Sequence, residues 1–383
     1  MLRAPEVLKV VWLPHSPNPA FAGVRLRCLM PCGLLRDRGI SARIALEPEG
    51  TAPDLAVVQA KWLLDTADPT ALRARMDRLR RWRDAGTALA LDSFDNYFVN
   101  ESGGIARARL LDAYRDVLPD FAAFVVSSPG LAPLLAAEIP PTAKVRIVGD
   151  PIELPGAERC YEPLLRRISP TRWQGHLRAT LQRIGVRRAA RDAHQLIWFG
   201  NHGSRYATGG IAELQRIVPQ LEAAYRQVPL QLTVVSNSRE RYEETMRGAS
   251  IPHAYVEWDR LHFARLLAAH DLALIPASIT PFTVAKSNNR LLLPLALGVP
   301  VAADGIPDYL PWRDHFALSP WARLPEVLAD LPGLRQLALA AAGPIASGHA
   351  LQRVADAWQR AFESILADAQ PRRMPPKAVH SGT

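Results

Sequence analysis

Short runs of apolar, β-branched residues alternate with longer helical patterns along most of this 383-residue chain. Runs this short, separated by helices, are typical of buried parallel strands in repeated strand–helix units. The alternation therefore predicts an α/β protein, and it constrains the fold more than any single motif. The runs lie at 7–13, 41–46, 55–62, 87–93, 121–128 and 144–150, and then at 195–203, 230–237, 254–258, 271–278 and 298–304.

The alternation stops between these two sets of runs. Residues 155–194 are rich in arginine and contain no strand-like run. We therefore predict two Rossmann-like, doubly wound parallel-sheet domains, 1–152 and 195–345, joined by an Arg-rich helical linker, 153–194. A last helix is expected over 346–369, and the Pro-rich, basic tail 370–383 is expected to be disordered.

The charge balance points to anionic partners. The formal net charge is +9, and nearly all of the positive charge is arginine. The arginines are spread along helices without an RNA-binding or helix-turn-helix motif, so we expect no nucleic-acid partner. The basic segments 72–83 and 159–191 either meet acidic lipid head groups or form solvated helix faces, and the sequence does not choose between these.

The sequence also bears on location and metals. No apolar run is long enough to span a bilayer, and the N-terminal residues lack the apolar core of a signal peptide. Cys28, Cys32 and Cys160 are an odd count without paired spacing, which fits a reducing compartment. No histidine cluster completes a zinc site with the first two cysteines. We therefore expect a cytoplasmic protein without a bound metal.

Ligands of open parallel sheets bind beyond the carboxyl ends of the strands. In the first half, Arg25 and Arg27 follow the first run, and the stretch DSFDN places Asp92 and Asp95 after another. The alternatives are purely structural roles: the arginines form the polar face of a helix, and the carboxylates end a strand and cap a helix. His15 and His202 also follow predicted strands, but the sequence shows no partner for either.

In the second half, two loops have the composition of anion sites. GNHGSR, residues 200–205, is glycine-rich, and KSNNR, residues 286–290, precedes the apolar run LLLPLALG. Glycine lets backbone approach a phosphate, and a helix start supplies free N–H groups, with Ser287 or Asn288 as the expected cap. Neither loop matches a Walker A or a G-x-G-x-x-G pattern. The alternatives are that GNHGSR is an ordinary turn between a strand and a helix, and that Lys286 and Arg290 only solvate the start of a helix.

The order of these segments resembles that of a known family. FGNHGS, VVSN, VEW, DLALIP and KSNNRLLLPLALGVPVAA resemble the nucleotide-binding half of GT-B-fold glycosyltransferases, in particular a group with a Lys-Ser-x-x-Arg/Lys stretch. The first half fits through GVRLRCLMPCGLLRDRGISARI, LALDSFDNYF and VVSSPGLAPLL, so the resemblance covers roughly residues 7–345. It implies two domains facing across a cleft, a donor side in the second domain, an acceptor side in the first, and a final helix that crosses back.

The resemblance also implies roles for particular residues. The acceptor side would include Gly23, Arg25 and Asn96, and Val256 and Trp258 would lie near the nucleotide base, although packing is an alternative role for the tryptophan. The donor diphosphate would be lined by Gly200, Asn201, Gly203, Ser204, Lys286, Ser287, Asn288, Asn289 and Arg290.

The chain departs from that family at one motif. Many retaining members have two glutamates separated by seven residues, and the corresponding positions here hold Ala285 and Leu293. Lys286 and Arg290 could still stabilise a diphosphate leaving group without a metal or a cofactor. Asp92 or Asp95 could act as a general base, and the sequence selects neither.

The resulting expectation is sugar transfer from a nucleotide-diphosphate sugar to a glycan or lipid-linked acceptor in cell-surface polysaccharide assembly, at the inner face of the membrane. The alternatives are an inactive binding or assembly protein of the same fold and a nucleotide-sugar epimerase.

Overall fold

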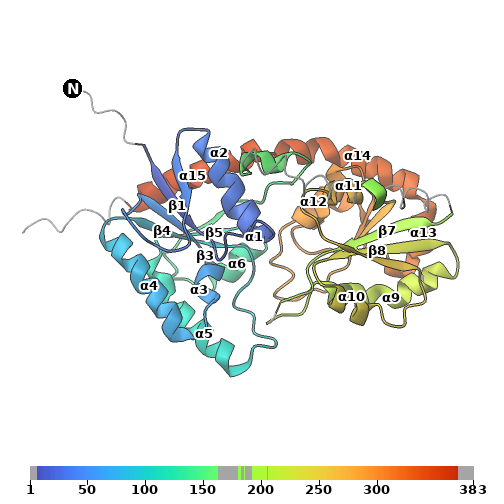
Figure 1. Ribbon diagram of the computed structural model, residues 1–383, viewed down its shortest axis with the longest axis horizontal. Helices are drawn as coiled ribbons and strands as arrows, with labels where there is room; N and C mark the ends of the chain where they lie inside the picture. The colour runs from blue at the N-terminus through green and yellow to red at the C-terminus, as the bar shows by residue number, and fades with distance from the viewer. Residues whose placement is uncertain (1–6, 163–179, 183–184, 186–191, 205, 370–383) are drawn as a thin grey trace, which may run out of the picture.

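A computed structural model describes residues 7–162, 180–182, 185, 192–204 and 206–369. The chain forms two lobes, each built around one parallel six-stranded sheet with helices on both faces (Figure 1). The predicted fold class, two Rossmann-like α/β domains, is confirmed. The expected tail 370–383 and most of the expected linker lie outside the described residues.

The first sheet has the strand order β2-β1-β3-β4-β5-β6. Every pairing is parallel; for example, Val10 lies opposite both Ala42 and Leu55. The order reverses its direction between β1 and β3, which creates a switch point where the connections leave on opposite faces. The strands are β1 Lys9–Leu13, β2 Ser41–Ile44, β3 Leu55–Gln59, β4 Ala88–Ser93, β5 Ala123–Val126 and β6 Val145–Ile147.

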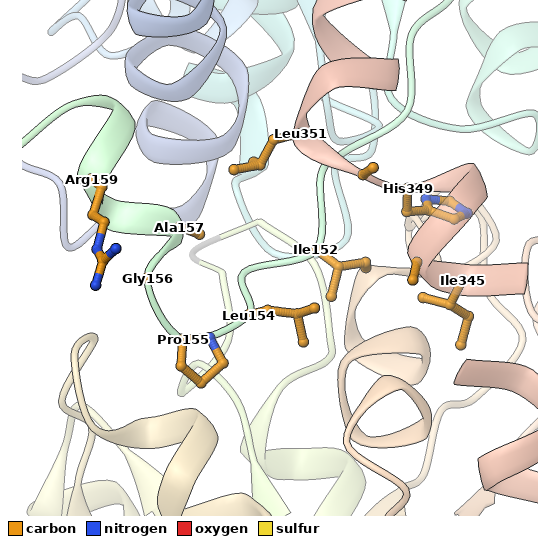
Figure 2. A pocket seen from close by; sticks show the side chains of 11 residues that line it. Ile152, Leu154, Pro155, Gly156, Ala157, Arg159, Ile345, His349 and Leu351 are labelled. Carbon is orange, nitrogen blue, oxygen red and sulfur yellow. The ribbon is translucent and has the colours of Figure 1, made fainter. Parts of the chain in front are cut away.

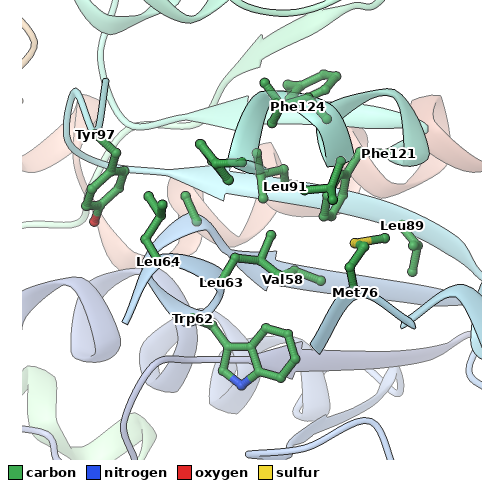
Figure 3. Packing of buried hydrophobic residues seen from close by; sticks show 14 of the residues in the cluster. Val58, Trp62, Leu63, Leu64, Met76, Leu89, Leu91, Tyr97, Phe121 and Phe124 are labelled. Atoms are coloured by element: carbon green, nitrogen blue, oxygen red, sulfur yellow. The ribbon is translucent and has the colours of Figure 1, made fainter. Parts of the chain in front are cut away.

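One face of this sheet is covered by α3 Ala60–Leu64, α4 Pro69–Asp84, α5 Gly104–Val117 and α6 Leu131–Ala136. Helix α4 illustrates why these helices pack against the sheet. Its apolar residues Leu72, Met76, Leu79 and Trp82 recur every three or four positions and are buried, while its arginines lie on the other side. Asp68 caps the helix by accepting a 2.9 Å hydrogen bond from the Ala71 N–H. Figure 3 shows Met76 packed with Leu89 and Phe121 in this core.

The opposite face is covered by one continuous helical stretch and by the C-terminal helix. The stretch comprises α1 Ala22–Val24, a π-helical turn Arg25–Leu29 and α2 Met30–Arg36. The C-terminal helix, α15 Leu351–Ala369, lies against α2 and the first sheet, at the end of the red ribbon in Figure 1. Trp358 on α15 meets Trp12 on β1 edge to face, with ring centroids 5.8 Å apart. The last helix of the chain therefore completes the core of the first domain.

The second sheet has the order β12-β11-β10-β7-β8-β9 and is also parallel throughout. Counted from its own first strand this is the Rossmann order 3-2-1-4-5-6, with the switch point between β7 and β10. The strands are β7 His194–Phe199, β8 Leu230–Ser236, β9 His253–Glu257, β10 Leu272–Ile275, β11 Val301–Ala303 and β12 Ala317–Leu318.

Helices cover both faces of the second sheet as well. One face carries α9 Ile211–Tyr225, α10 Arg239–Thr245 and α13 Leu324–Ala329. The other carries α11 Phe263–Leu267, α12 Asn289–Ala296 and α14 Leu331–Gly348. Helix α14 leads directly into α15, so the chain returns from the second domain to the first. No helix in the described part of the chain is long and apolar enough to span a bilayer.

Candidate functional site

The switch point of the second sheet brings the two predicted anion loops together. The glycine-rich loop follows β7, and the loop that leads to α12 follows β10, its neighbour in the sheet. A Cβ atom built on Gly200 would lie 3.3 Å from an Arg290 guanidinium nitrogen, so the two loops are in contact. Crevices at such switch points are the usual ligand sites of doubly wound sheets.

Arg290 has a guanidinium group with unused hydrogen-bond donors. Its Nε and one terminal nitrogen are shielded from solvent and have no hydrogen-bond partner among the described residues. The group lies over the rings of Trp198 and Phe199, at 5.0 and 5.3 Å from their centroids. Burial lowers the pKa of Arg290, and nearby Tyr309 and Glu213 oppose that change. Shielded donors without partners are costly in a folded protein, so this arrangement is suited to receive an anion.

The start of α12 is capped differently from the expectation. Ser287 donates a 2.8 Å hydrogen bond to Asp150, and the Asn288 side chain makes no capping bond. The Asp308 carboxylate instead accepts a 2.8 Å hydrogen bond from the backbone N–H of Asn288. The expected Ser287 or Asn288 cap is therefore wrong, because the tertiary fold delivers a carboxylate from the loop after β11. Asn289 donates a 2.8 Å bond to the carbonyl of Pro151, at the end of the first domain.

Lys286 faces the first domain. Its ammonium forms an ion pair with Asp95, which lies in the loop after β4. Asn96 donates a 2.9 Å hydrogen bond to the Pro281 carbonyl, and Ser128 donates a 2.7 Å bond to the Ala285 carbonyl. The predicted residues Lys286, Asp95 and Asn96 thus lie together on the boundary between the domains.

Asp92 lies away from this boundary, inside the first domain. Its side chain has no solvent exposure, and it pairs with Arg27 at 2.5 Å. Arg27 is itself 1% exposed and also reaches Asp150 at 3.3 Å. A carboxylate buried against an arginine would be costly to separate from it, so of the two candidate bases only Asp95 lies on the boundary between the domains. Asp92 does lie at the end of a strand, as one alternative expected, but it pairs with Arg27 rather than capping a helix, and Arg27 is buried rather than part of a polar helix face.

Arg25 also bridges the domains. It donates two hydrogen bonds, of 2.5 and 2.6 Å, to the carboxylate of Glu153, and its guanidinium lies 5.2 Å from the Trp258 ring centroid. Trp258 is half-buried at the end of β9 and packs beside the core of the second domain, and Val256 precedes it on that strand. Gly23, two residues before Arg25, lies against Phe94, whose ring would clash with a Cβ at 2.4 Å.

The glycine-rich loop reaches across to the first domain. Asn201 is exposed, and Ser204 accepts a 3.0 Å hydrogen bond from the Ala207 N–H. Gly203 has φ 117°, a conformation that favours glycine. The backbone N–H of Glu101 donates a 2.9 Å bond to Tyr206, and the ring of Tyr206 lies 3.7 Å from the Arg107 guanidinium. The loop therefore closes one end of the boundary between the domains.

Two residues near the switch points were given no partner or role from the sequence. His15, after β1, has its Nδ1 3.0 Å from the side-chain oxygen of Gln59, and its Nε2 is 3.3 Å from the Lys61 ammonium. Burial lowers the pKa of His15 and Lys61 adds to that effect, while the hydrogen bond with Gln59 opposes it. Glu213, on the first turn of α9, is buried and has one carboxylate oxygen without a partner among the described residues. The contacts of His15 are not visible in the sequence, because Gln59 and Lys61 come from β3 and α3, far along the chain from β1.

A separate pocket of about 400 Å³ lies where the chain passes between the domains (Figure 2). Its walls are mostly apolar, and they come from the segment after β6 and from the junction of α14 with α15. It contains none of the predicted site residues. The labelled lining residues are Ile152, Leu154, Pro155, Gly156, Ala157, Arg159, Ile345, His349 and Leu351.

The basic helix α4 carries much of its charge in ion pairs. Arg78 pairs with Glu47 at 2.8 Å, and Arg80 and Arg83 share Asp120. This pairing favours the solvated-face interpretation of residues 72–83. The second basic segment, 159–191, lies mostly outside the described residues.

Solved structures with the same architecture confirm the arrangement of the two domains. HepE of Anabaena, in complex with UDP and glucose, superposes with a TM-score of 0.61 and 12% identity over 93% of this chain and all of that chain. The chain has the GT-B fold. Sucrose-phosphate synthase of Thermosynechococcus elongatus gives a TM-score of 0.61 and 13% identity, covering 94% of this chain and 99% of the other.

A third GT-B neighbour is a glycosyltransferase of Rickettsia africae, with a TM-score of 0.58, 9% identity and coverage of 94% and 99%. No protein-family model and no curated protein matches the sequence. The likeness to GT-B proteins is therefore one of fold, and the chemistry has to be argued from this chain's own residues.

Proposed function

We propose that this protein is a glycosyltransferase that uses a nucleotide-diphosphate sugar as donor. One observation carries the proposal: the shielded, unpartnered guanidinium nitrogens of Arg290 adjoin the glycine-rich loop at the switch point of the second sheet. A diphosphate supplies the acceptors that these nitrogens lack. Several structural neighbours support a sugar nucleotide as the ligand, since HepE was solved with UDP and with UDP-glucose.

In the proposed reaction the second domain holds the leaving diphosphate. Negative charge grows on it as the sugar–phosphate bond breaks, and Arg290, Lys286 and the loop N–H groups stabilise that charge. Asp95 and Asn96 lie on the first-domain side of the boundary, where an acceptor hydroxyl would approach. Asp95 is our candidate for the general base. We propose a glycan or lipid-linked acceptor, in polysaccharide assembly at the cytoplasmic membrane face.

The test is direct. The purified protein is titrated calorimetrically with UDP, GDP, ADP, CMP and dTDP, and release of nucleotide from the matching sugar nucleotides is followed. We expect one nucleotide to bind, and Lys286→Ala and Arg290→Gln to weaken that binding. Failure of every nucleotide to bind would contradict the proposal.

A non-catalytic GT-B protein is the second candidate. The observation that favours this candidate is the absence of two glutamates. Ala285 and Leu293 occupy the positions where many retaining GT-B glycosyltransferases have glutamate, and both are buried apolar residues without a carboxylate. Nucleotide-sugar binding without turnover would favour this candidate. Conversion of the sugar nucleotide without any acceptor would instead indicate an epimerase.

A further inference from the structure

Lys286 already has an anionic partner in this structure. The Asp95 carboxylate of the first domain pairs with its ammonium, and the two side chains are 36% and 21% exposed. The ammonium also lies 3.9 Å from the centroid of the Phe282 ring. The neighbouring bonds from Asn96 to Pro281 and from Ser128 to Ala285 hold the two loops together, so the pair has a defined place on the boundary.

Arg290 and Lys286 therefore differ in their readiness to bind an anion. Arg290 has shielded nitrogens without partners among the described residues, whereas Lys286 is neutralised by a carboxylate from the other domain. A phosphate oxygen and a carboxylate oxygen are both charged acceptors for an ammonium. A diphosphate held by Arg290 would compete with Asp95 for Lys286.

We infer that Asp95 is an internal competitor of the donor, and that a bound diphosphate displaces it from Lys286. The exchange breaks one ion pair between the domains. The Asp95 carboxylate is then unpaired on the acceptor side, and this happens only when the donor site is filled. Asp95 then acts on donor binding through Lys286, as a positioning residue. This inference rests on the proposed function, because it requires a diphosphate at Arg290.

The experiment measures binding of UDP and of inorganic pyrophosphate to the full chain by titration calorimetry. Asp95→Asn removes the competing charge and keeps the size of the side chain. We expect it to tighten binding by about threefold to tenfold, as for loss of a partly exposed ion pair. Asp116→Asn is the matched control, because it removes an exposed carboxylate that pairs with Arg73 on the same domain. We expect this control to stay within about twofold of the wild type.

A double-mutant cycle with Lys286→Met makes the test specific. If the competition acts through Lys286, Asp95→Asn has no effect in the Lys286→Met background. Unchanged or weaker binding in Asp95→Asn would overturn the inference, and so would an equal gain in both backgrounds. In each of these cases loss of binding in Arg290→Gln would leave the proposed function standing. If no variant and no wild-type protein bound either probe, the proposed function itself would fall.

Discussion

Ser287, at the start of α12, donates a 2.8 Å hydrogen bond to Asp150, which lies at the end of the first domain. The other oxygen of Asp150 is 3.3 Å from Arg27, which pairs in turn with Asp92 on β4. A buried chain of charges and hydrogen bonds therefore runs from the first sheet to the helix that carries the proposed phosphate-binding arginine. It fixes where α12 begins relative to the first domain.

Replacing Arg27 tests this network. We expect Arg27→Met to lower the free energy of unfolding by about 3–5 kcal/mol, because it leaves two shielded carboxylates without their cation. Arg38→Met is the control, since Arg38 forms a more exposed pair with Asp356, and its loss should cost less than about 1 kcal/mol. Urea denaturation measures both. Equal losses of unfolding free energy for the two substitutions would show that the buried network stabilises the fold no more than an exposed ion pair does.

Gly130 tests the close approach of the two domains. A Cβ on Gly130 would lie 2.2 Å from the backbone carbonyl oxygen of Val284 in the second domain, and backbone cannot yield as a flexible side chain can. We expect Gly130→Ala to destabilise the contact between the two domains by about 1–3 kcal/mol and to weaken UDP binding. Gly149→Ala, which would meet no atom within 4 Å, is the control. Small-angle scattering should show a larger radius for Gly130→Ala alone, and identical profiles would contradict the prediction.

Asp308 should make stability depend on pH. Burial raises the pKa of its carboxyl from 3.8 to about 6, and Asp150 adds to the rise while the Asn288 N–H opposes it. A folded-state pKa above the unfolded value gives a contribution that is fully present below about pH 4 and lost as the pH rises through about 6.

The substitution Asp308→Asn isolates this contribution, because the amide oxygen can still accept from Asn288. We expect the variant to be more stable than the wild type at pH 7, by up to about 3 kcal/mol, and equal to it at pH 4. Asp314→Asn, an exposed position on the same domain, controls for the lost charge. Thermal unfolding across this pH range measures the difference, and a gain independent of pH would argue against the titration of Asp308.

Arg290 should be important for binding but not for stability. Because its shielded nitrogens have no partner among the described residues, we expect Arg290→Met to change the free energy of unfolding by less than about 1 kcal/mol. Pyrophosphate affinity should fall at least about tenfold, the value of a charge-assisted hydrogen bond. Arg323→Met, at an exposed arginine of the same domain, should leave both quantities unchanged. A large loss of stability in Arg290→Met would mean that this arginine is structural.

The sequence predicted much of this architecture because local patterns determine it. Apolar runs of strand length recur with helical segments between them, and each of the predicted runs overlaps a strand of one of the two sheets. The short edge strand β12 was missed, because two residues carry no periodic signal. The positions of Lys286 and Arg290 after β10 and of Asp95 after β4 could also be predicted, since the carboxyl end of a strand is visible in the sequence.

The sequence by itself therefore determined the class of fold, the positions of most strands along the chain and the residues at the strand ends. Only the tertiary structure decided what those residues meet. It buried Asp92 against Arg27, paired Asp95 with Lys286, capped α12 with Asp308 and left two guanidinium nitrogens of Arg290 without a hydrogen-bond partner among the described residues. The physical reason is that hydrophobic periodicity acts over neighbouring residues, whereas the energy of a charge depends on groups brought together from distant parts of the chain.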